Sequence, residues 1–362
     1  MHQQSKGVET AILVHIAVSA AASQEDLLEF QELALSAGVK PIDVVTAQCR
    51  TPTAKYFIGQ GKAEEIRDLV QRHHSSVVLV NHALSASQER NLEILCGCRV
   101  VDRTGLILDI FASRARTFEG KLQVELAQLQ HLSTRLIRGW THLERQKGGI
   151  GLRGPGETQL ETDRRLIRGR IKNLEKRLEK VRIQRDQSRQ SRRRAQIPTV
   201  SLVGYTNAGK STLFNRLTRS NVYVAHQLFA TLDPTVRRVM LPNGKPIVLA
   251  DTVGFIRHLP HDLVAAFRAT LLETQEASLL IHVIDISSAS VQDHIAQVNT
   301  VLTEISANNI PQLEIYNKID LVSGTEPHLE YNIEKNPAKV WISSQTGEGI
   351  DLLRDALAEI FS

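Results

Sequence analysis

One segment limits the fold of this chain more than any other: a predicted buried strand at residues 199–203 that runs through a glycine-containing loop into an amphipathic helix. The loop has the sequence GYTNAGKS at residues 204–211, and Leu213, Phe214 and Leu217 form the apolar face of the helix. This order satisfies the pattern G-x-x-x-x-G-K-[ST] in the strand and helix context that the pattern requires. The segment predicts a P-loop domain of the α/β class, although a plain glycine turn before a helix has the same outline.

The residue types of the loop suit the binding of phosphate groups. Gly204 and Gly209 let the backbone approach a phosphate closely, and the loop N–H groups and the helix N-terminus favour negative charge there. Lys210 is expected to reach the β and γ phosphates as a catalytic group, and Ser211 to coordinate Mg²⁺. The other loop residues predicted to contact the nucleotide are Tyr205, Thr206, Asn207 and Ala208.

Three further motifs follow in the order typical of GTP-binding proteins. Asp251 and Gly254 belong to a D-x-x-G pattern, in which Asp251 holds Mg²⁺ through water and the catalytic Gly254 N–H senses the γ-phosphate. Asp320, in an N-K-x-D pattern, can accept hydrogen bonds from guanine N1–H and N2–H₂, which adenine cannot supply. A fifth-motif loop at 343–345 is expected to donate a backbone N–H to guanine O6. We therefore predict GTP and GDP as ligands, and the remaining motif residues are Thr252, Val253, Asn317, Lys318, Ile319, Ser343, Ser344 and Gln345.

Residues 229–235, with the sequence FATLDPT, are predicted to be the first switch of the nucleotide site. Such a switch places a Thr hydroxyl on Mg²⁺ and the N–H of that Thr on the γ-phosphate. Thr231 is preferred to Thr235 for this catalytic and metal-binding role, and a structural turn ending at Pro234 is the alternative. The neighbours expected near the nucleotide are Phe229, Ala230, Leu232 and Asp233.

Two residues bear on the rate of GTP hydrolysis. Phe255 follows Gly254 at the position where Ras-like proteins have a Gln that orients the attacking water. Because an apolar side chain cannot orient water, we expect a slow intrinsic rate that a partner, closing of the switches or a monovalent cation raises. Asn207 is similar to the Asn of GTPases that use K⁺ near the phosphates, so K⁺ dependence is a hypothesis. The alternative is that Asn207 caps the backbone of its own loop.

Residues 10–114 alternate short apolar runs with helical stretches, which predicts a parallel sheet in a small α/β domain. The next region has helical periodicity instead, first in Leu residues between 122 and 136 and then at Ile167, Ile171, Leu174, Leu178 and Val181. Two such helices predict an antiparallel hairpin, or coiled-coil arm. The predicted parts are an N-terminal α/β domain at 1–115, the hairpin at 116–196 and a GTPase domain at 197–362. The expected strands are 11–18, 42–47 and 77–80, and the expected helices are 25–37, 63–72 and 87–95.

The second helix of the hairpin carries most of the positive charge of the chain. Between Arg164 and Arg194 there are fourteen Lys/Arg and three Asp/Glu, whereas the whole chain has a net charge of only +5. Such a block repels itself unless a polyanion neutralises it, which favours RNA as partner. A solvated face and a surface of acidic lipid are the alternatives, and the seam lacks the aromatic anchors of a membrane helix. Thr158 and Glu161 are spaced as a capping box, which predicts the start of this helix.

The composition excludes several other classes of protein. No apolar run reaches the ~20 residues of a membrane helix, and no export signal precedes the first domain, so a cytoplasmic location without an integral membrane segment is expected. Cys49, Cys96 and Cys98 do not complete a zinc pattern and are interpreted as reduced, structural thiols. We expect a monomer.

Beyond these motifs the sequence resembles the HflX family of bacterial translational GTPases over nearly its whole length. The resemblance lies in residues 55–62 (KYFIGQGK), 102–109 (DRTGLILD), 148–161 (GGIGLRGPGETQLE) and 229–235. It implies binding to the 50S ribosomal subunit or the 70S ribosome through the N-terminal regions, and a role in splitting or rescuing stalled ribosomes under stress. Members of the family commonly carry a further C-terminal domain, whereas this sequence ends at Ser362.

Two glycine loops outside the P-loop need separate interpretation. Residues 149–154 match G-x-G-x-x-G but follow a polar helical stretch rather than a strand, so the dinucleotide interpretation fails. We predict that the glycine-rich segment 148–156 is the tip of the hairpin and presses its backbone against rRNA phosphate; a flexible tip is the alternative. Residues 59–62 (GQGK) are predicted to be a turn before a helix.

Two functions of different class remain open from the sequence alone. The first is a GTPase whose switches control how the basic arm binds rRNA. The second is an rRNA-binding module with a structural guanine nucleotide and incidental turnover. Ser211, Thr231 and Asp251 together favour the first, because they complete a Mg²⁺ and γ-phosphate sensor that a structural nucleotide does not need.

Overall fold

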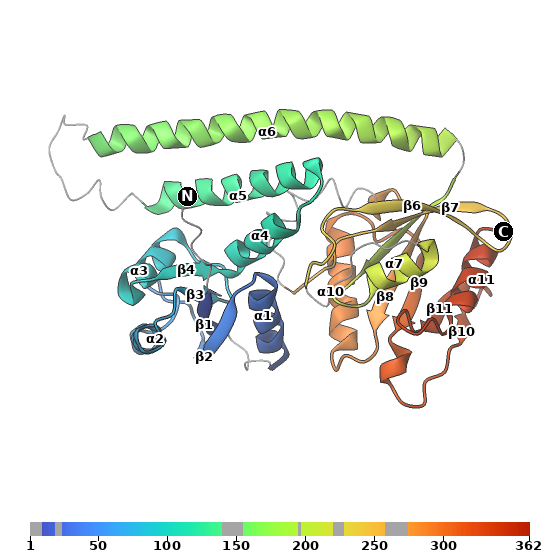
Figure 1. Ribbon diagram of the computed structural model, residues 1–362, viewed down its shortest axis with the longest axis horizontal. Coiled ribbons are helices and arrows are strands. Elements are labelled where there is room, and N and C mark those ends of the chain that lie inside the picture. Colours follow the sequence, from blue (N-terminus) through green and yellow to red (C-terminus); the bar gives the residue numbers. More distant parts are fainter. Residues whose placement is uncertain (1–8, 19–23, 140–154, 195–196, 220–227, 258–273) are drawn as a thin grey trace, which may run out of the picture. The chain divides into compact units, whose positions relative to one another are not determined.

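The computed structural model describes residues 9–18, 24–139, 155–194, 197–219, 228–257 and 274–362 (Figure 1). The chain divides into two compact units, one formed by Met1–Ser113 and Lys121–Leu178 and the other by Arg114–Gly120 and Glu179–Ser362. The three-part division at 115/116 and 196/197 stays a prediction.

The first unit contains a four-stranded sheet in the order β2-β1-β3-β4, and all of its pairings are parallel. This confirms the predicted parallel α/β domain. The central strand β1 is buried along nearly its whole length, because a parallel sheet is covered on both faces by the helices that connect its strands. The elements are β1 (Thr10–Val18), α1 (Gln24–Ser36), β2 (Lys40–Cys49), α2 (Gln60–His73), β3 (Val77–Val80), α3 (Ala86–Cys96), β4 (Arg99–Asp102) and α4 (Arg103–Arg114).

The segments 55–62 and 102–109, which carry the family resemblance, have structural roles in this unit. The carboxylate of Asp102 accepts hydrogen bonds from the backbone N–H of Gly105 and Leu84, at 2.8 and 3.1 Å, and so caps the start of α4. The predicted turn at 59–62 is corrected: only Gly59 precedes α2, as its N-cap, and residues 60–62 already belong to the first turn of the helix. All three cysteines are free, and burial raises the pKa of the Cys96 thiol to about 12, in accord with a structural thiol.

Two long helices, α5 (Phe118–Gly139) and α6 (Pro155–Arg194), lie side by side in Figure 1. Leu122 and Leu126 of α5 pack with Leu174 of α6, and Leu129, Ile171 and Leu178 join this cluster. The seam of α6 is confirmed, since its apolar positions are buried or half-buried while most of the residues between them are exposed. The expected tip loop at 148–156 lies mostly outside the described residues.

The structure corrects the predicted start of α6 and the outer end of the α5 seam. The helix begins at Pro155, so Thr158 and Glu161 lie inside it rather than at its start. Proline at the first position suits a helix because its φ is already helical and it has no N–H to leave unpaired. Leu132 is 45 % exposed rather than part of the seam.

Helix α5 is buried on a second face that the single leucine stripe did not predict. Val124 and Ala127 are buried, and the Arg135 guanidinium lies 2.9 Å from the buried Asp102 carboxylate and also pairs with Glu89. This face therefore joins α5 to the four-stranded sheet.

The second unit contains a seven-stranded sheet in the order β10-β11-β9-β8-β5-β7-β6, and only its edge strands β10 and β6 are antiparallel to their neighbours. This confirms the predicted P-loop GTPase fold of the α/β class. Asn243 and Gly244, with φ of +78° at Gly244, lie in the turn of the β6–β7 hairpin as expected. The elements are β5 (Thr199–Gly204), α7 (Lys210–Thr218), β6 (Thr235–Met240), β7 (Pro246–Asp251), β8 (Leu279–Asp285), α10 (Val291–Glu304), β9 (Gln312–Asn317), η1 (Ile319–Leu321), β10 (Leu329–Tyr331), β11 (Pro337–Ile342) and α11 (Ile350–Ile360).

Within the described part of the chain, no helix combines the length and the apolar character needed to cross a membrane.

Candidate nucleotide site

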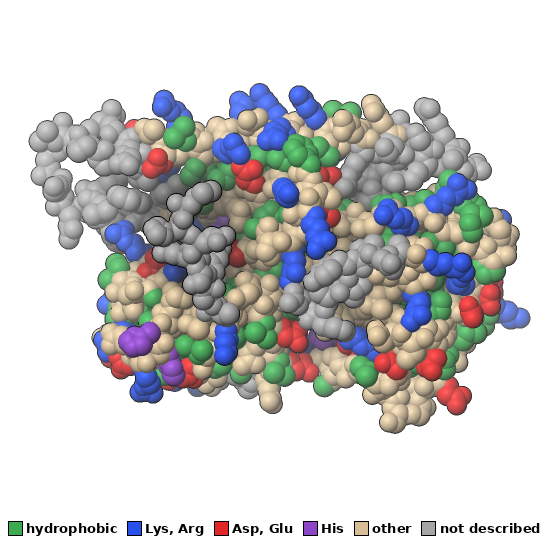
Figure 2. Space-filling view, in the orientation of Figure 1, with side chains coloured by type: hydrophobic (Ala, Val, Ile, Leu, Met, Phe, Trp, Pro, Cys, Tyr) green, Lys and Arg blue, Asp and Glu red, His purple; other side chains and the backbone are tan. Residues whose placement is uncertain are grey.

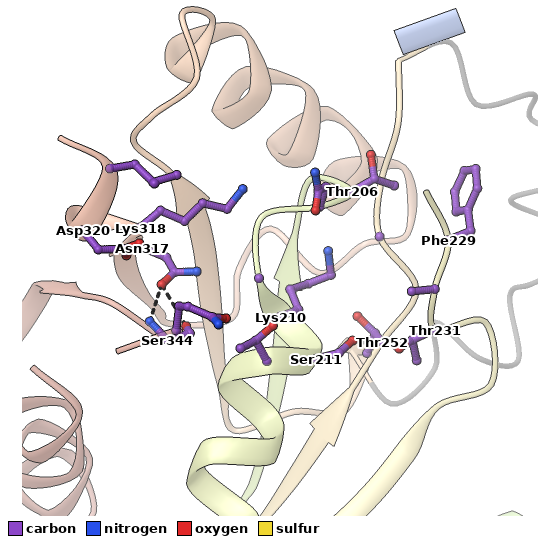
Figure 3. Close-up of a pocket in the computed structure, with 17 residues that line it drawn as sticks. Thr206, Lys210, Ser211, Phe229, Thr231, Thr252, Asn317, Lys318, Asp320 and Ser344 are labelled. Atoms are coloured by element: carbon purple, nitrogen blue, oxygen red, sulfur yellow. Dashed lines mark hydrogen bonds between the residues drawn. The ribbon is translucent and has the colours of Figure 1, made fainter. Parts of the chain in front are cut away.

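The carboxyl ends of β5, β7, β9 and β11 meet at one edge of the large sheet, and the predicted motifs follow these strands directly. A cavity of about 320 Å³ lies there. Figure 3 shows Asn317, Lys318 and Asp320 on one side of it and Ser211 with Thr231 on the other. The lining residues are Thr206, Asn207, Gly209, Lys210, Ser211, Thr212, Phe229, Ala230, Thr231, Thr252, Gly254, Asn317, Lys318, Asp320, Leu321, Ser344 and Gln345.

Both glycines of the P-loop are required by close contacts. A Cβ at Gly204, where φ is +148°, would lie 2.3 Å from the Val283 carbonyl oxygen. A Cβ at Gly209, where φ is +98°, would lie 2.2 Å from the Asn317 Nδ2 atom. The loop therefore closes tightly against β8 and the N-K-x-D segment only because these positions lack side chains.

Asn317 joins three of the motifs. Its Nδ2 donates to the Ala208 carbonyl oxygen at 2.7 Å, and its Oδ1 accepts from the backbone N–H and the hydroxyl of Ser344, at 2.9 and 2.8 Å. Lys318 forms an ion pair of 2.6 Å with Asp285. The loop that carries Asp320 is thus held to the P-loop on one side and to the fifth motif on the other.

Ser211, Thr231 and Asp251 form a cluster of oxygen atoms at the opposite end of the cavity. The Ser211 hydroxyl donates to Asp251 Oδ2 at 2.8 Å and lies 2.8 Å from the Thr231 hydroxyl. Asp251 Oδ1 is buried and has no hydrogen-bond partner among the described residues. Hydroxyl and carboxylate oxygens with spare acceptor capacity are the ligands that Mg²⁺ prefers, so this donor set fits the ion.

Lys210 is buried beside this cluster. Its Nζ donates to the carbonyl oxygens of Gly204 and Tyr205, at 3.0 and 2.6 Å. Burial lowers the pKa of Lys210 to about 8, and the charge of Asp251 opposes the shift only in part. Burial also raises the pKa of Asp251, against the hydrogen bond from Ser211. The charged forms of Lys210 and Asp251 are therefore only partly stabilised by their neighbours. Bound phosphates would stabilise the Lys210 ammonium, and a divalent cation would stabilise the Asp251 carboxylate.

Gly254 packs so closely against the P-loop that a side chain at this position would displace its neighbours. A Cβ there would lie 2.9 Å from Thr206 Cγ2 and 3.0 Å from Lys210 Nζ. The next residue, Phe255, is 1 % exposed, and its carbonyl oxygen accepts from the Thr206 N–H at 2.7 Å. The Phe255 side chain points into the core and leaves no water-orienting group at this position.

Several residues predicted for the site do not line the cavity. Tyr205 instead stacks on His294, with ring centroids 3.9 Å apart, and its hydroxyl accepts from the Arg257 N–H. Asp233 contacts residues 116–117. The alternative switch residue Thr235 begins β6, and Thr231 is the one that faces the cavity. The other predicted residues outside the lining are Gly204, Ala208, Leu232, Asp251, Val253, Ile319 and Ser343.

Three residues that contribute to the site were not predicted from the sequence. Thr212 and Leu321 line the cavity directly after their motifs, so their adjacency was the available signal. Arg216 donates to the carbonyl oxygens of Ser344 and Gln345. No sequence signal pointed to it, because its partners are more than one hundred residues away.

The comparisons with known proteins agree with this geometry. Residues 24–112 match the family model described as GTP-binding GTPase N-terminal, residues 114–192 match GTP-binding GTPase Middle Region, and residues 199–318 match 50S ribosome-binding GTPase. The GTPase HflX of Escherichia coli K12 is 63 % identical over 354 residues, which are 98 % of this chain and 83 % of that protein. The chain belongs to the HflX family. The HflX protein of Caldanaerobacter subterraneus subsp. tengcongensis is 47 % identical over 99 % of the chain and 82 % of its own length.

A solved structure extends the match to the fold. The crystal structure of SsGBP in complex with GDP is 28 % identical, covers 97 % of this chain and 98 % of its own, and has a TM-score of 0.53. As a member of the HflX family, the chain is a GTPase: it binds GTP and GDP, and it hydrolyses GTP.

Proposed function

We propose that this GTPase associates with the 50S ribosomal subunit and the 70S ribosome through the helical arm at 116–196, and that it takes part in splitting or rescuing stalled ribosomes under stress. The observation that carries the proposal is the surface of α6, whose apolar seam is buried or half-buried while most of its described Lys and Arg side chains are exposed. Blue Lys and Arg side chains stand along α6 in Figure 2. The match of residues 199–318 to the 50S ribosome-binding GTPase model supports the same partner.

At the nucleotide, we assign the phosphates to the P-loop and guanine to the N-K-x-D side. Lys210 would bind the β and γ phosphates, and Ser211 and Thr231 would hold Mg²⁺, with Asp251 holding it through water. Bound Mg²⁺ would neutralise the charge that develops on the phosphates. Gly254 presents its N–H to the γ-phosphate. The loss of that phosphate on hydrolysis releases Thr231, which changes the switch and thereby the grip on rRNA.

Hydrolysis also requires a group that replaces the missing water-orienting side chain. Asn207 lines the cavity and has a left-handed backbone conformation, with φ of 59°. We propose K⁺ at this position as the activating charge. Phosphate release should therefore be faster in KCl than in NaCl, and equal rates in the two salts would remove K⁺ from the proposal.

The second candidate function is an rRNA-binding module in which GTP turnover is incidental, and the buried Phe255 favours it because it implies slow hydrolysis. Sedimentation with purified 50S subunits distinguishes the two. We expect more protein to sediment with a non-hydrolysable GTP analogue than with GDP, and phosphate release to rise when subunits are added. Equal sedimentation with both nucleotides, without stimulation of hydrolysis, would support the module. A monomeric state and a cytoplasmic location remain part of this proposal.

A further inference from the structure

The switch segment is held at a second point, outside the nucleotide cavity. Two residues after Thr231, the Asp233 carboxylate turns to residues 114–120, which belong to the same compact unit. Its Oδ2 accepts from the backbone N–H groups of Arg116 and Thr117, at 2.8 and 2.9 Å, and its Oδ1 accepts from the Thr117 hydroxyl at 2.5 Å. All three of these hydrogen bonds therefore join the Asp233 carboxylate to Arg116 and Thr117.

The segment that Asp233 binds is the beginning of α5. The Thr117 hydroxyl accepts from the Gly120 N–H at 3.0 Å, which is the bond of an N-cap residue. A Cβ at Gly120 would lie only 2.0 Å from Asp233 Oδ1, so the first turn of the helix is shaped to admit the carboxylate. A carboxylate at this end of a helix satisfies N–H groups that have no partner within the helix and complements the helix dipole.

The chain between the two contacts is short and fixed. Thr231 contacts Ser211 through a hydrogen bond of 2.8 Å, and Leu232 is 2 % exposed in the core. Asp233 then contacts the start of α5. Because a residue spans at most ~3.6 Å, Thr231 stays within ~7 Å of Asp233, so the two contacts lie on one short segment. The helix that begins at this contact, α5, is also the first helix of the arm.

We propose that Asp233 is a positioning residue for Thr231: its bonds to Arg116 and Thr117 hold the switch where the Thr231 hydroxyl can ligate Mg²⁺ in the GTP state. By reciprocity, GTP with Mg²⁺ stabilises the capped first turn of α5. The start of the arm thereby responds to the γ-phosphate. This inference rests on the proposed role of Thr231 as a Mg²⁺ ligand.

Nucleotide affinities of single and double variants test the positioning role. Asp233→Ala should lower the affinity for a non-hydrolysable GTP analogue with Mg²⁺ by about tenfold, within the range of known couplings between sites. The affinity for GDP should change less than twofold, since Thr231 is released in that state. The matched control is Asp351→Ala, which removes another aspartate from the first turn of a helix, α11, and should leave both affinities unchanged.

The double variant Thr231→Ala/Asp233→Ala separates this inference from the proposed function. If Asp233 acts through Thr231, the double variant should bind the analogue no more weakly than Thr231→Ala alone. Additive losses, or equal losses for GDP and the analogue, would overturn the positioning role. If Thr231→Ala itself left the analogue affinity unchanged, the proposed Mg²⁺ site would fail instead, and the inference with it.

Amide hydrogen exchange on the unmodified protein tests the reciprocal statement without any substitution. The N–H groups of Arg116 and Thr117 should exchange about tenfold more slowly with the GTP analogue and Mg²⁺ than with GDP. The N–H groups of α11 provide the internal reference, because that helix takes no part in the switch. Equal exchange of Arg116 and Thr117 in the two nucleotide states would contradict the coupling.

Discussion

Lys210 shows how far the sequence specifies a single site residue. Its place in the P-loop pattern was predictable, because glycines and a strand–helix junction fix where that lysine lies. Its pKa was not predictable, since the shift depends on burial against Asp251 and two carbonyl groups. The hydrogen bonds of Arg216 and Asn317 were not predictable either, because their partners lie in motifs that are distant in the sequence.

The lowered pKa of Lys210 predicts proton uptake on nucleotide binding. With a pKa of about 8, the empty site at pH 8 holds about half a proton at Lys210, and bound phosphates favour the charged form. Calorimetric titration with GDP at pH 8, in two buffers of different ionisation enthalpy, should report uptake of about half a proton. The uptake should disappear in Lys210→Arg, since arginine stays charged at this pH. Equal heats for the unmodified protein in both buffers would contradict the shift.

The lowered pKa of Lys210 also makes the stability of the fold depend on pH. Between pH 8 and the unfolded value of 10.5, the unfolded chain binds more protons at Lys210 than the folded chain does. This group therefore makes the nucleotide-free protein more stable as the pH rises through that window.

A second prediction at this scale concerns Asp320 and the choice of base. Asp320→Asn keeps the size of the side chain but replaces one acceptor oxygen by a donor, which then faces the N–H groups of guanine. We expect the affinity for GDP to fall by ~100-fold, the size of a lost charge-assisted hydrogen bond. Fluorescence titration with a labelled GDP measures this, and Asp351→Asn serves as control. An unchanged affinity would mean that another group recognises guanine.

The helices of the arm show which features of an element the sequence predicts and which it does not. The seam of α6 was predictable from its heptad spacing, because the buried and half-buried side chains among the described residues of that helix share one face. Helix α5 was predicted less well, since the ion pair of Arg135 with Asp102 and the buried Val124 give it a second face. A single leucine stripe does not reveal such a face, because its polar members look like solvent-exposed residues in the sequence.

The hairpin seam leads to a prediction with an internal control. Leu174 is 1 % exposed in the seam, so Leu174→Ala should lower the free energy of unfolding by ~2–5 kcal/mol. Leu166, on the same helix, is 63 % exposed, and Leu166→Ala should change it by less than ~0.5 kcal/mol. Urea denaturation of both variants measures the difference. Equal effects of the two substitutions would mean that Leu174 does not hold α6 to α5.

For the binding of a partner by the whole molecule, the uneven distribution of charge matters more than the net charge. The chain as a whole carries +5, but residues 164–194 alone contain fourteen Lys/Arg and three Asp/Glu. The fold could be predicted from patterns within each part of the sequence, whereas the partner is an inference from this imbalance and from the family. The binding of ribosomal particles should therefore depend on α6 more than on cations elsewhere.

The effect of salt on binding tests whether ribosomal particles are bound through α6. If exposed cations of α6 neutralise rRNA phosphates, the logarithm of the association constant for 50S subunits should fall linearly and steeply with the logarithm of the salt concentration. Replacing three exposed α6 cations by Gln, at Arg165, Arg168 and Lys172, should make the slope shallower by about 2–3, because each lost phosphate contact accounts for ~0.7–0.9.

The matched control removes the same charge from other elements, with Gln at the exposed Arg72, Arg238 and Lys245. If net charge alone governed binding, both triple variants would change the slope equally. If α6 lies on the rRNA, only the α6 variant changes it, because counterions are released only where cations meet phosphates. A slope that responds to the control and not to the α6 variant would place the RNA contact outside the arm.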